Sequence, residues 1–74
     1  MNKKRRGQLA CVISKLQDNA SILMAIQEEE QMTLDNLPES FAMSEKGEKM
    51  EEAVSQLEEA VSQIEDIVQN LEEI

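Results

Sequence analysis

Carboxylates are the side chains in this 74-residue sequence whose type and spacing suggest chemistry. They recur as adjacent pairs seven residues apart, at Glu51-Glu52 and Glu58-Glu59, and paired carboxylates serve both glycosidases and di-iron helical bundles. The sequence has no His, the usual general base and the commonest metal ligand. Its single Cys11 can form neither an internal disulfide nor a structural zinc site. Any catalytic or metal site therefore depends on where the carboxylates point.

A heptad repeat decides where these carboxylates point. Residues 51–57, 58–64 and 65–71 have the sequences EEAVSQL, EEAVSQI and EDIVQNL, which predict one long helix. Apolar residues fill three adjacent heptad positions, with Val54, Val61 and Val68 at a, Met50, Leu57, Ile64 and Leu71 at d, and Ala53, Ala60, Ile67 and Ile74 at g. Every e and f position from Glu51 to Glu73 is acidic. The carboxylates thus lie outside the apolar seam, and we predict no enzyme, no metal site and no cofactor.

The N-terminal half predicts a second, less regular helix. Its heptad stripe consists of Leu9, Leu16 and Leu23 at d, Ile13 and Ala20 at a, and Val12 and Ile26 at g. Ile22 and Met24 lie off this stripe, so the helix has apolar surface on a second side. Pro38 bounds the helix, because the residue before a proline disfavours the α conformation.

The predicted boundaries are a helix over 4–34, an elbow over 35–43 and a helix over 44–73. Ser44 is the best N-cap for the second helix, and Gly47 is expected to weaken its first turn. Four apolar residues near the elbow are expected to fold back over this end of the core: Leu34, Leu37, Phe41 and Met43.

These elements predict an all-α fold, a single domain over 1–74 that forms an antiparallel, coiled-coil-like hairpin. A chain this short rarely builds a sufficient core alone, and a lone hairpin leaves the second side of its first helix in water. We therefore expect a homodimer in which two hairpins form a four-helix bundle. The residues expected at its interface are Val12, Ile22, Met24, Ile26 and Ile67.

Charge is distributed unevenly, with 16 acidic and 7 basic residues and a formal net charge of −9. Four cations occupy Lys3–Arg6, whereas residues 50–74 contain eight carboxylates and no cation. Both placements oppose the helix dipole. An antiparallel hairpin explains them if the cations lie beside the carboxylates of Glu65, Asp66, Glu72 and Glu73. The alternative is that the basic tip binds a phosphate or another partner.

The acidic row suggests a partner for the protein. Its eight charges span about 33 Å, and two such helices on one side of a dimer would carry roughly one charge per 2 Å, against about 1.7 Å for duplex DNA. A protein with a basic groove is therefore a candidate partner; the alternative is a solvated face that only keeps the bundle soluble. The residues expected to bind this partner lie in the row and the elbow: Glu51, Glu52, Glu58, Glu59, Glu65, Asp66, Glu72, Glu73, Asp35, Asn36 and Glu39.

Other partners are disfavoured by composition. Phe41 is the only aromatic residue, so bases have no stacking platform, and the net negative charge opposes direct nucleic-acid binding. No run of consecutive apolar residues is long enough to span a membrane, and no apolar segment with a cleavage site follows Lys3–Arg6. We expect a cytoplasmic protein, in which Cys11 stays reduced.

Four segments carry a resemblance to a known family: the opening MNKKRR, the elbow DNLPES, the restart SEKGEKMEEA and the tail EEAVSQLEEAVSQIEDIVQNLEEI. They resemble small acidic helical-hairpin proteins of Firmicutes phages and prophages, which share a D-N-[LM]-P-E-[SN] elbow. This sequence departs from the family in its first helix, where residues 10, 11, 14 and 21–26 replace Glu/Lys-rich heptads. The resemblance implies a bacterial host cell and a phage or prophage setting, but no particular activity.

Two functions are consistent with these features. The first is a non-catalytic inhibitor of a host defence or nucleic-acid-handling protein, acting through the acidic helical face. Anti-CRISPR and other anti-defence proteins supply the analogy. The alternative is a structural or accessory bundle that assembles with itself and has no enzymatic target.

Overall fold

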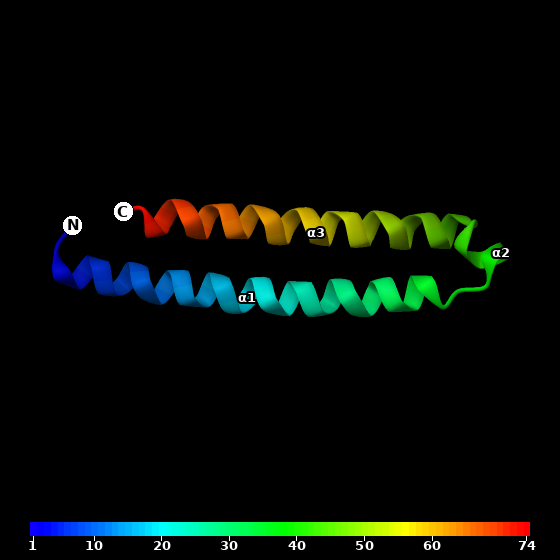
Figure 1. Cartoon of the computed structure of the whole chain (residues 1–74), viewed down its shortest axis with the longest axis horizontal. Coiled ribbons are helices and arrows are strands. Elements are labelled where there is room, and N and C mark those ends of the chain that lie inside the picture. The colour runs from blue at the N-terminus through cyan, green and yellow to red at the C-terminus, as the bar shows by residue number, and fades with distance from the viewer.

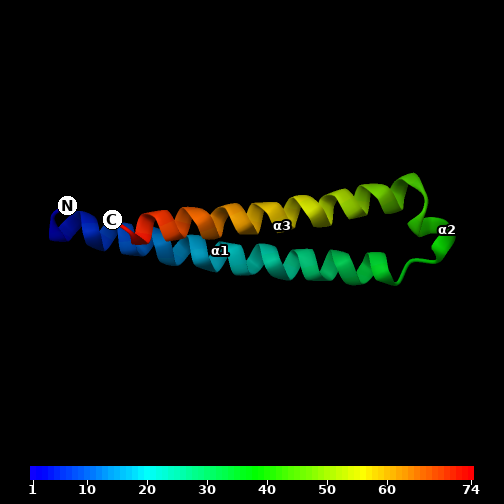
Figure 2. The same cartoon turned by 45° about the horizontal axis from the view of Figure 1, so that its top comes forward.

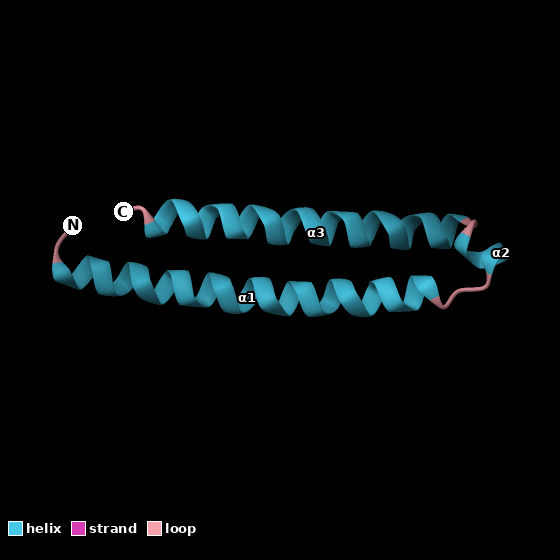
Figure 3. Cartoon of the chain, in the orientation of Figure 1, coloured by secondary structure: helices cyan, strands magenta, loops and turns pink.

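The chain folds into a long antiparallel helical hairpin, described here from a computed structural model of all 74 residues. Helix α1 (Lys3–Asp35) and helix α3 (Glu45–Glu72) lie side by side, and the short helix α2 (Glu39–Ala42) joins them (Figure 1). Both termini lie at the end opposite α2, and helix accounts for nearly all of the chain (Figure 3). The hairpin measures 58 × 15 × 12 Å. The prediction of an all-α, two-helix hairpin is confirmed.

Helix α1 begins one residue before the predicted start and ends one residue after the predicted end. Asn2 is its N-cap, and the Asn2 side-chain oxygen accepts a hydrogen bond from the backbone N–H of Arg5 at 2.8 Å. This bond satisfies one of the donors that a helix N-terminus leaves free. At the other end, the backbone N–H of Asn36 donates to the Met32 carbonyl at 3.1 Å.

The hairpin core follows the predicted heptad register. Val54, Val61 and Val68 at a in α3 are buried, as is Ala20 at a in α1. The d residues of both helices are half-buried: Leu9, Leu16, Leu23 and Glu30 in α1, and Met50, Leu57, Ile64 and Leu71 in α3. Only two helices meet along this seam, so each valine is covered from one side. No side chain is therefore completely buried.

A polar contact crosses the seam near its centre. Gln27, at an a position, is half-buried, and its Nε2 donates to Glu58 Oε1 at 2.9 Å. A hydrogen bond between two specific side chains favours one axial alignment of the helices over alignments shifted by a turn, because a shift leaves the half-buried amide unpaired. The sequence places a glutamine at this heptad a position, but it does not identify the residue that the glutamine contacts.

The elbow differs from the prediction in two respects. Residues 35–43 are not all loop, because Glu39–Ala42 form the single-turn helix α2 directly after Pro38. Proline is compatible with a helix start, where its missing N–H costs nothing. Leu37 is half-buried, but Phe41 and Met43 point into solvent with 57% and 76% of their surface exposed. The expectation that Phe41 and Met43 cover the core is therefore wrong for the hairpin alone.

Ser44 occupies the predicted N-cap position of α3, but its side chain does not cap the helix. The Ser44 hydroxyl donates instead to the carbonyl oxygen of Phe41. The same carbonyl also accepts the backbone N–H of Ser44 at 3.1 Å, so Ser44 is turned back toward the end of α2 and its hydroxyl does not reach the first N–H groups of α3.

Gly47 has a packing role that the sequence analysis missed. It is buried at the first a position of α3, where the end of α2 approaches the helix. A Cβ at residue 47 would overlap the carbonyl oxygen of Ala42 and lie 2.7 Å from that of Phe41. The missing side chain therefore allows the backbone of α2 to pass directly over α3, and this close approach outweighs the low helix propensity of glycine.

Replacing this glycine tests the packing role. Gly47→Ala is expected to lower the melting temperature, because the added methyl group displaces α2, although alanine favours helix by about 1 kcal/mol. Gly7→Ala is the matched control, since a Cβ there meets nothing within 4 Å, and it should raise the melting temperature by a few degrees. Thermal unfolding followed by circular dichroism measures both. Equal stabilisation by the two substitutions would show that α2 does not constrain Gly47.

Candidate functional site

The predicted acidic row is continuous and solvent-exposed along α3. All eight carboxylates from Glu51 to Glu73 are exposed. Their e and f positions turn them away from the valines that face α1. Because an α-helix rises about 1.5 Å per residue, a repeat of seven residues presents pairs of negative charges about 10 Å apart.

Few contacts neutralise this row. Glu58 accepts the hydrogen bond from Gln27, and Glu59 Oε1 accepts a bond from Gln63 Nε2 at 3.4 Å. The one ion pair of the hairpin joins Lys49 Nζ to Glu45 Oε1 at 3.4 Å, and both side chains are exposed. It lies before the row begins, so no cation of the chain pairs with the eight carboxylates.

The predicted elbow residues extend the acidic surface around the end of the hairpin. Asp35, Asn36 and Glu39 are all exposed. Asp35 Oδ1 accepts a hydrogen bond from Gln31 Nε2 at 2.8 Å, which orients this carboxylate at the last turn of α1. Glu39 opens α2. All three side chains are thus accessible to solvent at the end of the hairpin where the acidic row begins.

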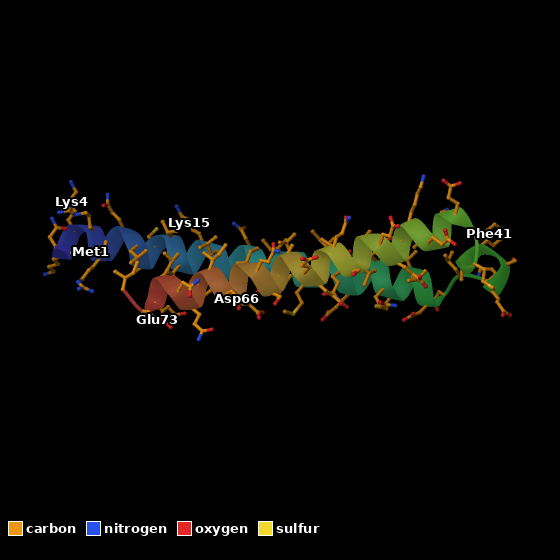
Figure 4. All side chains as sticks on the ribbon, turned by 90° about the horizontal axis from the view of Figure 1, so that it is seen from above. Met1, Lys4, Lys15, Phe41, Asp66 and Glu73 are labelled. Atoms are coloured by element: carbon orange, nitrogen blue, oxygen red, sulfur yellow. The ribbon has the colours of Figure 1, made fainter.

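The basic end does not neutralise the acidic end, contrary to expectation. No ion pair joins Lys3–Arg6 to Glu65, Asp66, Glu72 or Glu73. Figure 2 shows the reason: α1 is longer than α3 and extends past the C-terminus, so its first turn lies beyond the last turn of α3. Only Arg6 reaches across, donating from Nη1 to the backbone oxygen of Ile74 at 3.5 Å. Viewed from above, Lys4 and Lys15 lie on one edge of the hairpin and Asp66 and Glu73 on the other (Figure 4).

A second candidate surface is apolar and is shared by both helices. In an antiparallel pair, the g positions of the two helices line the same side of the seam, and the e positions line the opposite side. Val12 and Ile26 of α1 therefore adjoin Ala53, Ala60 and Ile67 of α3. Val12, Ile26 and Ile67 are each about half exposed, at 47–48%, and Ile22 borders them at 58%. We call this side the g face.

Met24 does not belong to the g face, although it was grouped with these residues. It is 40% exposed and occupies an e position, which places it on the other side of the seam. Its neighbours there are glutamine and glutamate, including the Gln27–Glu58 pair. The five residues predicted for one oligomer interface therefore divide between two sides of the hairpin.

Helix α1 is long and apolar enough to cross a membrane when judged by length and composition alone. The polar residues Lys15, Gln17, Asp18 and Asn19 lie in the middle of this helix. A charged side chain at the centre of a span costs about 2.5–3.5 kcal/mol. The length and composition of α1 would permit a membrane span, whereas its polar central residues disfavour one. The absence of a membrane segment and the cytoplasmic location therefore stay predictions.

No group of three or more carboxylate or thiol side chains lies close enough to hold a metal ion. Cys11 is exposed and unpaired. The features that remain as candidate functional sites are the acidic row with its elbow, the basic tip and the g face.

Comparison with protein-family models, with curated proteins and with solved structures found no match to this chain. The resemblance to phage and prophage hairpin proteins therefore stays an expectation from the sequence. Function has to be argued from the surfaces of the hairpin themselves.

Proposed function

We propose that this chain is a non-catalytic binding protein that inhibits a host defence or nucleic-acid-handling protein through the acidic row of α3. The observation that carries the proposal is the row itself, in which eight exposed carboxylates follow one helix and have no cation beside them. Sustained repulsion of this kind destabilises an isolated helix, whereas a basic partner would relieve it.

The shape of the hairpin suits occlusion of a groove. It is a rod 58 Å long and 15 Å wide, with its charges on the outer side of one helix. A groove that binds nucleic acid is lined by Lys and Arg and attracts such a rod at long range. The exposed Asp35, Asn36 and Glu39 at the elbow would add specific contacts at one end of the groove.

The cellular setting follows from the resemblance rather than from the structure. We propose that the protein acts in the cytoplasm of a bacterial host, as phage and prophage inhibitors do. Inhibition would need no chemistry by this chain, because covering a nucleic-acid groove blocks access to it.

A second candidate function is a structural or accessory protein whose partner is another copy of itself. The g face favours this candidate, because Val12, Ile22, Ile26 and Ile67 expose apolar surface that a monomer would leave in water. The hairpin alone buries only five residues, and a four-helix bundle would enlarge this thin core. The two proposals are compatible, since the acidic row lies away from the g face.

Charge reversal tests the inhibitor proposal. The triple variant Glu59→Lys, Glu65→Lys and Asp66→Lys should weaken binding to a partner captured from Firmicutes lysate at low salt by about tenfold or more, because it replaces attraction with repulsion. Glu58 is left unchanged so that its bond to Gln27 persists. Biolayer interferometry at low and high salt measures the affinity, and circular dichroism confirms that the variant folds.

The control reverses three carboxylates outside the row, Asp18→Lys, Glu28→Lys and Glu48→Lys, and so changes the net charge equally. This control should retain most of the affinity. If both triple variants bound like the original protein, or if binding were unaffected by salt, the acidic row would not be the contact surface.

Substitution on the g face tests the self-association proposal. Ile22→Glu should shift the protein from dimer to monomer, because it places a charge against apolar surface. Met24→Glu is the matched control and should leave the dimer intact, since Met24 lies on the other side of the hairpin. Sedimentation equilibrium in high salt separates these outcomes. Dissociation by Met24→Glu alone would place the interface on the acidic side instead.

A further inference from the structure

The g face carries most of the cations of the hairpin as well as exposed apolar side chains. On the outer surface of a coiled coil, each c position adjoins g and each b position adjoins e. The g and c positions of the two helices hold one carboxylate, Glu29, and four of the seven cations: Arg5, Lys15, Lys46 and Lys49. Of these cations, only Lys49 forms an ion pair, with Glu45. The g face is therefore both apolar and cationic, in a chain whose net charge is −9.

The opposite side of the hairpin has the reverse charge. The e and b positions of the two helices hold one cation, Lys3, and seven carboxylates: Glu28, Asp35, Glu48, Glu51, Glu58, Glu65 and Glu72. The f-position carboxylates of α3 project from its outer edge, and Lys15 and Asp66 lie on opposite edges of the hairpin (Figure 4). A flat surface that touches the g face thus meets cations and apolar side chains but few carboxylates.

We infer that the g face docks on the surface of a membrane that contains anionic lipids, with the hairpin lying flat on the headgroups. Apolar side chains bordered by Lys and Arg are typical of proteins that lie in the membrane interface. The side chains that enter this interface are about half exposed in the hairpin: Val12, Ile22, Ile26 and Ile67. Lysine keeps its ammonium group at headgroup level while apolar side chains go deeper. Lys15 and Asn19, which disfavour a membrane span, therefore do not oppose this arrangement.

Electrostatics favours a lipid surface over a second copy on this face. Two packed g faces would bring together twice the four cations and only two carboxylates, and like charges within the screening length of about 8–10 Å repel. Anionic headgroups supply the opposite charge instead, and each Lys or Arg near such a surface strengthens binding. The membrane and a second copy therefore compete for the g face, and low salt favours the membrane.

The acidic side of the hairpin does not prevent this contact. Its e and b carboxylates lie across a helix from the g face, and a helix with its side chains is about 10–12 Å thick. Charges farther apart than about 8–10 Å are largely screened at ordinary ionic strength. The docked hairpin directs these carboxylates away from the membrane, so the acidic row stays accessible to a protein partner. The docking therefore stands independently of the inhibitor proposal.

Vesicle flotation of the full chain tests the docking. At low salt, the protein should float with vesicles made of equal parts phosphatidylglycerol and phosphatidylcholine. Its partition coefficient on pure phosphatidylcholine should be lower by about tenfold or more, because the cations then lack opposite charge. Lys15→Gln together with Lys46→Gln should weaken binding to the anionic vesicles by about tenfold, since two unpaired cations leave the g face. Equal binding to both kinds of vesicle would overturn the inference.

The control makes the same change in net charge on the opposite side, with Gln17→Glu and Gln69→Glu. Gln17 occupies an e position of α1, Gln69 occupies a b position of α3, and both side chains are exposed. This control should keep most of the binding to the anionic vesicles, because its new charges face away from them. Equal loss in the two double variants would show that net charge, and not the g face, governs the attraction, and it would overturn the docking.

A single tryptophan reports which side meets the lipid, because the chain contains none. Ile26→Trp places the indole on the g face, and Met24→Trp places it on the opposite side; the original side chains are 47% and 40% exposed. Addition of the anionic vesicles should shift the fluorescence of Ile26→Trp to shorter wavelength, since the indole leaves water, and should leave that of Met24→Trp nearly unchanged. Equal shifts, a shift in Met24→Trp alone, or no shift in either variant would overturn the docking.

Sedimentation equilibrium of the same protein without vesicles separates the two occupants of the g face. Flotation with the anionic vesicles supports the docking whether the protein in solution is a monomer or a dimer. A dimer that does not float would assign the g face to a second copy and overturn the inference. A monomer that does not float would overturn both the docking and the self-association. The inhibitor proposal would survive either result, because charge reversal of the acidic row tests it separately.

Discussion

The packing of three valines of α3 against α1 is the contact on which the rest of the molecule depends. Val54, Val61 and Val68 are the largest residues that the chain buries, and they recur every seven residues because only one side of α3 meets another helix. A seam this narrow leaves most positions of both helices exposed. The surface therefore divides by heptad position, with carboxylates at e and f and apolar side chains at g.

The elbow determines how the two helices are offset along the seam. Helix α2 passes over α3 at Gly47, and the Ser44 hydroxyl bonds back to α2 instead of capping α3. The Gln27–Glu58 hydrogen bond favours the same alignment near the centre of the seam. With the helices aligned at the elbow, the longer α1 extends past α3 at the other end. The basic tip consequently lies beyond the acidic helix whose charge it was expected to balance.

The two main surfaces make different demands on a partner. The acidic row gains from a basic surface, and its contribution weakens with salt because exposed charges are screened. The g face gains from removing apolar side chains from water, which salt does not oppose. Because these surfaces lie on different sides of the hairpin, a dimer formed through the g face would display two acidic rows to other proteins. The same protein could then self-associate through the g face and inhibit a partner through its acidic rows.

The amino-acid sequence by itself determined the helical hairpin, the heptad register and the exposure of every carboxylate in the acidic row. A strict seven-residue repeat fixes which side of a helix is apolar, whatever its partner. It did not determine the role of Gly47, the Gln27–Glu58 pair, the helix within the elbow or the exposure of Phe41 and Met43. Those features depend on the distance and offset between segments far apart in the chain. Only the tertiary structure sets this offset, and with it the placement of Lys3–Arg6 beyond the end of α3.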